Sequence, residues 1–197
     1  MAVEPEVLYE RIRAASDDDG RLGLSRMTGW EIFPYEPDGL RVVPVEPPSL
    51  PEEPRSGEGG RSCWSCDDPM PAVWEDERWR LVRLPEESGV LTLMLQPKAH
   101  HDLSDLPDDL AGELGLLLVR TSRAVEALPN IARAHISKWG DGGAHLHVFV
   151  FARPEGFPQL RGTCLALWAD ALPALPDDEA DADARAVGDA LRATPLR

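Results

Sequence analysis

Two histidines, His145 and His147, stand one residue apart at the start of an alternating run that follows the glycine-rich segment 140–143. Because alternate side chains of a β-strand share a face, both imidazoles are expected on one side of a strand, about 6.6 Å apart. The other strand face would carry core residues, which are Leu146, Val148 and Val150. Two imidazoles on one surface can bind a metal ion or act as a nucleophile. The alternative is that both are partly buried polar residues of an ordinary strand.

A second candidate group is the CxxC pair Cys63 and Cys66. Two thiolates at this spacing can bind one Zn²⁺, which prefers four tetrahedral nitrogen and sulfur ligands, so two further ligands are needed. The candidates are the five histidines of the chain: His100, His101, His135, His145 and His147. Three cysteines are too few for a disulfide framework in 197 residues. A redox pair, or two ordinary thiols in a loop, are the alternatives to half a metal site.

These motifs together carry a family resemblance. The segment His145–Phe151 resembles the histidine triad motif, in which histidines alternate with apolar residues, and Gln96–His100 resembles the Pro-Lys-x-His segment upstream of it. With the preceding CxxC, their order is similar to the zinc-bearing branch of the histidine triad (HIT) superfamily. That branch includes galactose-1-phosphate uridylyltransferase and some diadenosine polyphosphate hydrolases and phosphorylases. The resemblance covers roughly residues 62–155.

The resemblance implies an α+β fold with a five-stranded antiparallel sheet, paired into a homodimer, that acts at the α-phosphate of a small nucleotide or nucleotide conjugate. His147 would be the nucleophile and would form a nucleotidyl-histidine intermediate. A structural Zn²⁺ would be bound by Cys63, Cys66, His100 and His145, with His101 as the alternative to His100. Hydrolysis and nucleotidyl transfer stay equally open. A zinc-stabilised nucleotide-binding or scaffold module without catalysis is the rival interpretation.

The chain departs from the family motif at two places. Phe149 stands where the family has its third histidine, or a glutamine in the uridylyltransferases, and an aromatic ring can neither donate a proton nor hydrogen-bond a phosphate oxygen. The polar residue expected just before the motif is also absent, and Gly142, Gly143 and Ala144 stand there. The backbone N–H groups of Gly142 and Gly143 are therefore expected to bind phosphate oxygens. Cations expected near the substrate are Lys98, Lys138, Arg153 and Arg161.

The elements that must position these residues can be read from hydrophobic periodicity. Three short strands are expected at 72–75, 79–84 and 90–96, as an antiparallel meander. Apolar residues at helical spacing predict a helix over 107–128. Two further strands, 131–139 and 145–152, are expected to form a hairpin across the glycine turn. Two helices are expected after residue 158, near 160–172 and 177–191, and the second is acidic enough to be a solvated or docking element.

The N-terminal third of the chain differs in composition from the rest. A helix is expected over 3–15 and a hairpin over 28–45 around Pro37–Gly39, whereas prolines and glycines over 44–62 predict a linker. The expected organisation is an N-terminal arm with linker over 1–61, a HIT-like domain over 62–158, and a C-terminal helical extension over 159–197.

The charge of the chain limits its partners. Twenty Lys and Arg against 35 Asp and Glu give a formal net charge of −15, which repels nucleic acid polymers and anionic membranes. A small phosphorylated substrate needs local donors that outweigh this field. No apolar run is long enough for a membrane span, and the acidic N-terminus does not resemble a signal peptide, so a cytoplasmic protein is expected.

Overall fold

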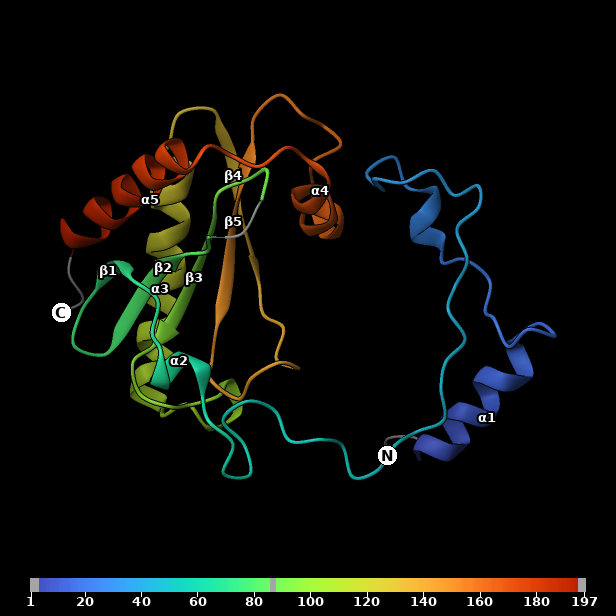
Figure 1. The fold of residues 1–197 in the computed structure, drawn as a ribbon. Helices are drawn as coiled ribbons and strands as arrows, with labels where there is room; N and C mark the ends of the chain where they lie inside the picture. The colour runs from blue at the N-terminus through green and yellow to red at the C-terminus, as the bar shows by residue number, and fades with distance from the viewer. Residues whose placement is uncertain (1–3, 86–87, 195–197) are drawn as a thin grey trace. The chain divides into compact units, whose positions relative to one another are not determined.

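The computed structural model describes residues 4–85 and 88–194 of the chain. They fall into two compact units, Met1–Glu53 and Pro54–Arg197 (Figure 1). Residues 54–61, which composition places in the linker, belong to the second unit because they hydrogen-bond to the glycine loop. The Ser56 N–H donates to the Gly142 carbonyl (3.3 Å), and the Ala144 N–H donates to the Ser56 carbonyl (2.9 Å).

The first unit contains one α-helix, α1 (Pro5–Ala15), and a 3₁₀ turn, η1 (Arg26–Gly29). The hairpin expected over 28–45 is wrong, since residues 4–53 contain no strand. Only the turn forms, with the Leu40 N–H donating to the Pro37 carbonyl (3.1 Å). Proline has no N–H to donate to a ladder, and Pro34, Pro37 and Pro44 interrupt both expected arms.

The second unit is built on a five-stranded antiparallel sheet with the order β1-β2-β3-β5-β4. The α+β fold with a five-stranded antiparallel sheet expected from the sequence is therefore confirmed, and so is the meander of the first three strands. The strands are β1 (Ala72–Glu75), β2 (Trp79–Arg83), β3 (Thr92–Pro97), β4 (Ile131–Ser137) and β5 (Val148–Pro154).

Helices α3 (Asp108–Glu126) and α5 (Asp177–Arg192) lie side by side on one face of this sheet (Figure 1). The acidic helix α5 is an integral part of the fold, because its residues Ala184, Val187 and Leu191 are buried in the main core cluster. The helix α4 (Leu165–Ala171) packs with Phe151 in a separate apolar cluster. Three short elements complete the unit: α2 (Trp64–Asp67), η2 (Leu103–Asp105) and η3 (Gly162–Cys164). Among the described residues, no helix has the length and apolarity to cross a bilayer.

The strand that should carry both histidines begins later than expected, at Val148 instead of His145. Its last pair with β3 is Leu95↔Val148, and the Leu146 N–H donates outside the sheet, to the carbonyl of His101 (2.6 Å). Pro97 has no N–H with which to continue the ladder. The alternation nevertheless extends through 145–151, because Leu146, Val148 and Val150 all lie in the main core cluster.

The packing of α5 on β1 gives a stability prediction at Gly188. A Cβ there would lie 2.3 Å from the backbone oxygen of Val73. Gly188→Ala is therefore expected to lower the free energy of unfolding by about 1–3 kcal/mol, as overpacking typically does. Gly112→Ala in α3 is the matched control: nothing lies within 4 Å of its Cβ position, so helix propensity should raise stability by up to about 1 kcal/mol. Urea unfolding measures both, and equal stability of the two variants would contradict this packing.

Candidate functional site

Four side chains that can bind a metal ion meet at one end of the sheet: Cys63, Cys66, His100 and His145. Their ligand atoms all lie within 4.8 Å of one another. The cysteines flank the first turn of α2, where the Cys66 and Asp67 N–H groups donate to the Cys63 carbonyl (3.0 and 2.9 Å). The histidines come from the segment after β3 and the segment before β5. Residues far apart in the sequence thus place their ligand atoms at distances that suit one small cation.

The distances within this Cys/His cluster match a tetrahedral metal. His145 Nδ1 lies 3.5 Å from Cys63 Sγ and 3.4 Å from Cys66 Sγ, and His100 Nδ1 lies 3.6 Å from Cys66 Sγ. A zinc ion with bonds of about 2.3 Å to sulfur and about 2.0–2.1 Å to nitrogen would have sulfur–nitrogen edges of roughly 3.6 Å. Both cysteines are free thiols. The donor set and its spacing therefore fit Zn²⁺.

His145 is fully buried, and its ring orientation is fixed from both sides. Its Nε2 lies 2.8 Å from the carbonyl oxygen of Pro97, which places the proton on Nε2 and leaves the Nδ1 lone pair facing the two sulfurs. A metal-binding histidine commonly has such a carbonyl behind it. Burial lowers the pKa of His145 below its usual value, so the ring is neutral at neutral pH and able to act as a ligand.

His100 rather than His101 belongs to the Cys/His cluster. His101 faces Asp105 at 4.0 Å instead. Room for the His100 ring depends on Gly57, which has a φ of 87° and whose Cβ, if present, would lie 2.5 Å from His100 Cε1. Sequence reasoning missed Gly57 because it is one of several glycines in a segment expected to be a linker.

The protonation of Cys66 makes metal binding dependent on pH. Partial desolvation of the thiol, together with a hydrogen bond to Cys63, raises the pKa of Cys66 to about 11, so the thiol must release a proton when a metal binds. The apparent association constant for Zn²⁺ is expected to rise by at least about tenfold per pH unit between about pH 6.5 and 8.5. Titration against a chelator calibrated at each pH measures it. A pH-independent constant would show that Cys66 is not a thiolate ligand.

His147 is oriented by its own backbone. Its Nδ1 lies 2.7 Å from the carbonyl oxygen of His145, which fixes the proton on Nδ1 and leaves Nε2 as the free basic nitrogen. The rings of Trp64 and Phe149 are at 6.0 and 5.5 Å, centroid to centroid. The residue is only 8% exposed.

The glycine loop packs against the N-terminal edge of the second unit. Gly143 pairs with Ser56 in an isolated parallel bridge. Its Cβ position lies 3.0 Å from the indole Nε1 of Trp64, the residue whose ring contacts His147. The carbonyl of Gly142 accepts a hydrogen bond from Ser56. Gly143 therefore lies next to Trp64, and the Trp64 ring lies next to His147, the candidate nucleophile. Trp64 was not expected at the site from the sequence.

The four cations expected at the substrate have protein partners in the structure. Lys98 pairs with Glu75 (2.9 Å), and Lys138 pairs with Asp102 (3.3 Å). Arg153 donates to the carbonyl of Leu160 (3.0 Å). Arg161 is the residue before η3 and also has interactions within the chain.

A cation that sequence reasoning missed, Arg55, contacts the glycine loop. It donates to the Gly140 carbonyl (2.6 Å) and pairs with Asp102 (2.8 Å), the same carboxylate that Lys138 contacts. The ion pairs of Asp102 with Arg55 and Lys138 connect the segment that carries His100 to the N-terminal edge of the unit and to the residues beside the glycine loop. No periodicity or motif in the expected linker indicated this arginine.

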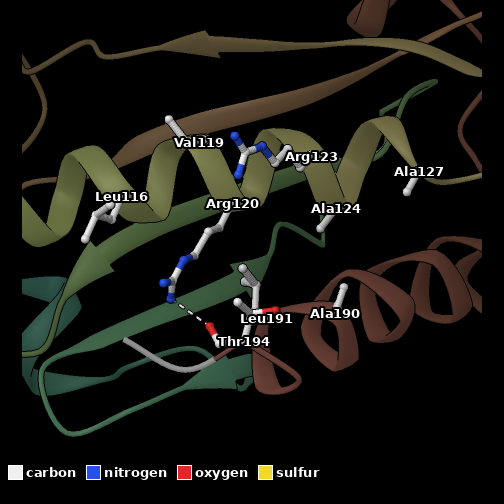
Figure 2. Close-up of a pocket in the computed structure, with 9 residues that line it drawn as sticks. All are labelled: Leu116, Val119, Arg120, Arg123, Ala124, Ala127, Ala190, Leu191 and Thr194. Carbon is white, nitrogen blue, oxygen red and sulfur yellow. Dashed lines mark hydrogen bonds between the residues drawn. The ribbon is translucent and has the colours of Figure 1, made fainter. Parts of the chain in front are cut away.

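A groove of about 430 Å³ lies elsewhere, between α3 and α5 (Figure 2). It is lined by apolar side chains with Arg120, Arg123 and Thr194, and Arg120 donates to the Thr194 carbonyl (2.7 Å). Among the described residues, its lining contains no histidine, cysteine or carboxylate. The groove has none of the chemistry expected of the site, which is confined to the Cys/His cluster and His147.

The sequence matches no protein-family model and no curated protein. Solved structures with a similar chain path are histidine triad proteins. A Hit-like protein from Bartonella henselae, described as involved in cell-cycle regulation, is 16% identical, with 65% of this chain and 92% of that chain covered and a TM-score of 0.46. A histidine triad protein from Bradyrhizobium japonicum is 20% identical (59% and 87% covered, TM-score 0.47). A Zn-bound histidine triad family protein from Mycobacterium smegmatis is 21% identical (64% and 91% covered, TM-score 0.45).

Proposed function

We propose that this protein is a zinc-containing enzyme of the HIT type that hydrolyses or transfers a nucleotidyl group at an α-phosphate through His147. The observation that carries the proposal is the paired arrangement of two adjacent histidines. His145 lies in the Cys/His cluster, and its carbonyl fixes the Nδ1 proton of His147. This places the lone pair on Nε2, the nitrogen that a nucleophilic imidazole would use.

Zinc in this proposal is structural. Cys63, Cys66, His100 and His145 would be its ligands, and four protein ligands leave no open position for water. The bound ion supplies a crosslink between the CxxC turn and the segment that precedes His147. The chain's own residues then hold the nucleophile, because His145 sets the position of the carbonyl that His147 uses.

The proposed reaction has two displacements. His147 Nε2 donates its lone pair to the α-phosphorus, a P–N bond forms, and the P–O bond to the leaving group breaks. The ring is then cationic, and the His145 carbonyl continues to accept the Nδ1 proton. Water or another nucleophile next forms a bond to phosphorus and releases its proton to solvent, while the P–N bond breaks and its electron pair returns to Nε2. Phe149 cannot protonate the leaving group, so good leaving groups with a low pKa are the expected substrates.

The substrate, the oligomeric state and the location of the enzyme are also part of the proposal. We expect a small nucleotide or nucleotide conjugate as substrate, a homodimer, and the cytoplasm as the location. Backbone N–H groups at Gly142 and Gly143 remain the proposed phosphate donors, with Lys98, Lys138, Arg153 and Arg161 as the proposed cations. Lys138 would first have to release Asp102, and Lys98 would have to release Glu75.

A zinc-stabilised nucleotide-binding or scaffold module without catalysis is the second candidate. Phe149 favours it, since this ring fills the place of a polar triad residue and packs against Trp139 (5.2 Å between centroids) and His147. The low exposure of His147 favours it as well.

The experiment that separates the two uses nucleotides labelled at the α-phosphate. The zinc-loaded full chain is incubated with labelled diadenosine and diuridine polyphosphates and nucleoside phosphoramidates, then denatured at neutral pH. Label that remains on the protein and is released by acid supports a phosphohistidine-type intermediate. Saturable nucleotide binding with neither label nor turnover would support the binding module and overturn the catalytic proposal.

A further inference from the structure

A layer of buried polar side chains lies directly beneath the CxxC turn. Ser65, between the two cysteines, is fully buried, and its Oγ donates to Oε1 of Gln96 (2.7 Å). The carbonyl of the same serine accepts a hydrogen bond from Nη2 of Arg80 (3.0 Å). Two strands of the sheet therefore hold the middle residue of the turn, one through its side chain and the other through its backbone.

Arg80 on β2 and Gln96 on β3 are directly paired in the sheet. Their neighbours Leu81 and Leu95 belong to the main core cluster, so both polar side chains point to the opposite face, towards the CxxC turn. They are 7% and 0% exposed. Buried charge and amide groups are costly, and an apolar pair at these positions would stabilise the sheet better. Packing within the sheet alone therefore does not explain why polar side chains occupy these two positions.

The layer is also incompletely satisfied. Among the described residues, Arg80 Nε and Gln96 Nε2 are two of the buried nitrogens that lack a hydrogen-bond partner. Unsatisfied buried donors are rare in native proteins, so two of them in one layer call for an explanation. The next residue of β3, Pro97, accepts from Nε2 of His145, so the same strand end supports the second half of the Cys/His cluster.

We propose that Arg80, Ser65 and Gln96 form a positioning layer that holds the CxxC turn in its metal-binding geometry and sets the affinity for Zn²⁺. The inference rests on the zinc centre of the proposed function. Hydrogen bonds to both sides of Ser65 fix the turn before the metal arrives, so less ordering is required on binding. Residues that support metal ligands in this way typically change affinity by about 10–100-fold.

The first test compares Arg80→Met with Arg83→Met in the full chain. Arg83 lies on the same strand, but it pairs with Asp177 and Asp181 of α5 and is the matched control for loss of an arginine. Zn²⁺ alone is the probe, and competition with a chromogenic chelator gives the dissociation constant and the release rate. Arg80→Met is expected to weaken zinc binding by about 10–100-fold, while Arg83→Met retains the wild-type constant.

Ser65→Ala provides a second variant that leaves the charge and both cysteines in place. We expect roughly tenfold weaker zinc binding. The control is Ser122→Ala, whose Oγ donates to the Leu118 carbonyl within α3, and its zinc binding should be unchanged. The visible spectrum of the Co²⁺-substituted protein is the second readout, since a distorted turn alters the thiolate-to-cobalt bands even where the fold is intact.

The possible outcomes test the positioning layer and the proposed zinc site separately. Weaker zinc binding and altered cobalt spectra for Arg80→Met and Ser65→Ala support the layer, whether or not His147 becomes labelled. Wild-type zinc constants and spectra in both variants overturn the layer and leave the metal centre intact. A wild-type chain that binds no zinc overturns both.

Discussion

His147→Ala is expected to abolish nucleotidyl transfer or hydrolysis, with kcat/KM reduced by about 10³-fold or more. The reason is that the methyl group has no lone pair, while the other residues of the site lack a substitute in the same position. His145 directs its Nδ1 to the sulfurs, and its Nε2 is engaged by Pro97. Loss of acid-labile label on the protein and loss of product are the two measurements.

The control for this substitution is His135→Ala. His135 lies on β4, where it pairs with Phe151, and burial together with the nearby Arg153 lowers its pKa below the usual value. In the described part of the chain no hydrogen bond or ring contact joins it to the Cys/His cluster or to His147, so turnover should stay within about twofold. Zinc content and thermal stability should be unchanged in His147→Ala. Label that persists in this variant would assign the nucleophile to another residue.

Much of the second unit follows from periodicity. Four of the five strands and the long helix lie within two residues of their expected ends, because their apolar residues face a single core. The alternation through 145–151 also predicts correctly that Leu146, Val148 and Val150 are buried together. These are local signals, and the sheet that they form is the one expected.

The end of the strand that carries His145 and His147 could not be predicted in the same way. Alternation indicates which side chains share a face, whereas the ladder ends where a partner strand stops donating. Here the partner reaches Pro97, and Leu146 instead donates to the carbonyl of His101. The histidines thus lie before the first residue of β5, where the His145 ring reaches the Cys/His cluster and the His145 carbonyl accepts from His147.

Long-range polar contacts are the other part that the sequence did not predict. Arg55, Ser56 and Gly57 stand in a segment whose composition is that of a linker, yet they contact Asp102, the glycine loop and His100. Arg80 and Gln96 occupy strand positions where polar residues normally face water, and they are buried because the CxxC turn covers them. Such contacts depend on tertiary structure and leave no periodic pattern in the sequence.

Removal of zinc is expected to have the second large effect, a loss of thermal stability with local loosening around the metal centre. At free zinc about 1,000 times its dissociation constant, binding stabilises the folded state by about 4 kcal/mol. For a chain of this size each kcal/mol shifts Tm by about 2–4 °C, so chelation should lower Tm by about 8–16 °C. Metal analysis of the untreated protein should give about one zinc per chain, whereas a redox pair would bind none.

The loss should be confined to the elements that the metal connects. Hydrogen exchange is expected to accelerate after chelation at the Cys66 and Asp67 amides, which donate to Cys63, and at Leu146, which donates to His101. Amides of the β2–β3 ladder should keep their protection, because fully buried residues such as Trp79 and Leu95 hold these strands in the main core. Cys63→Ser should show the same exchange pattern without chelator and no further Tm shift with it. Uniform loss of protection across the ladder, or a Tm insensitive to chelation, would contradict a local structural zinc.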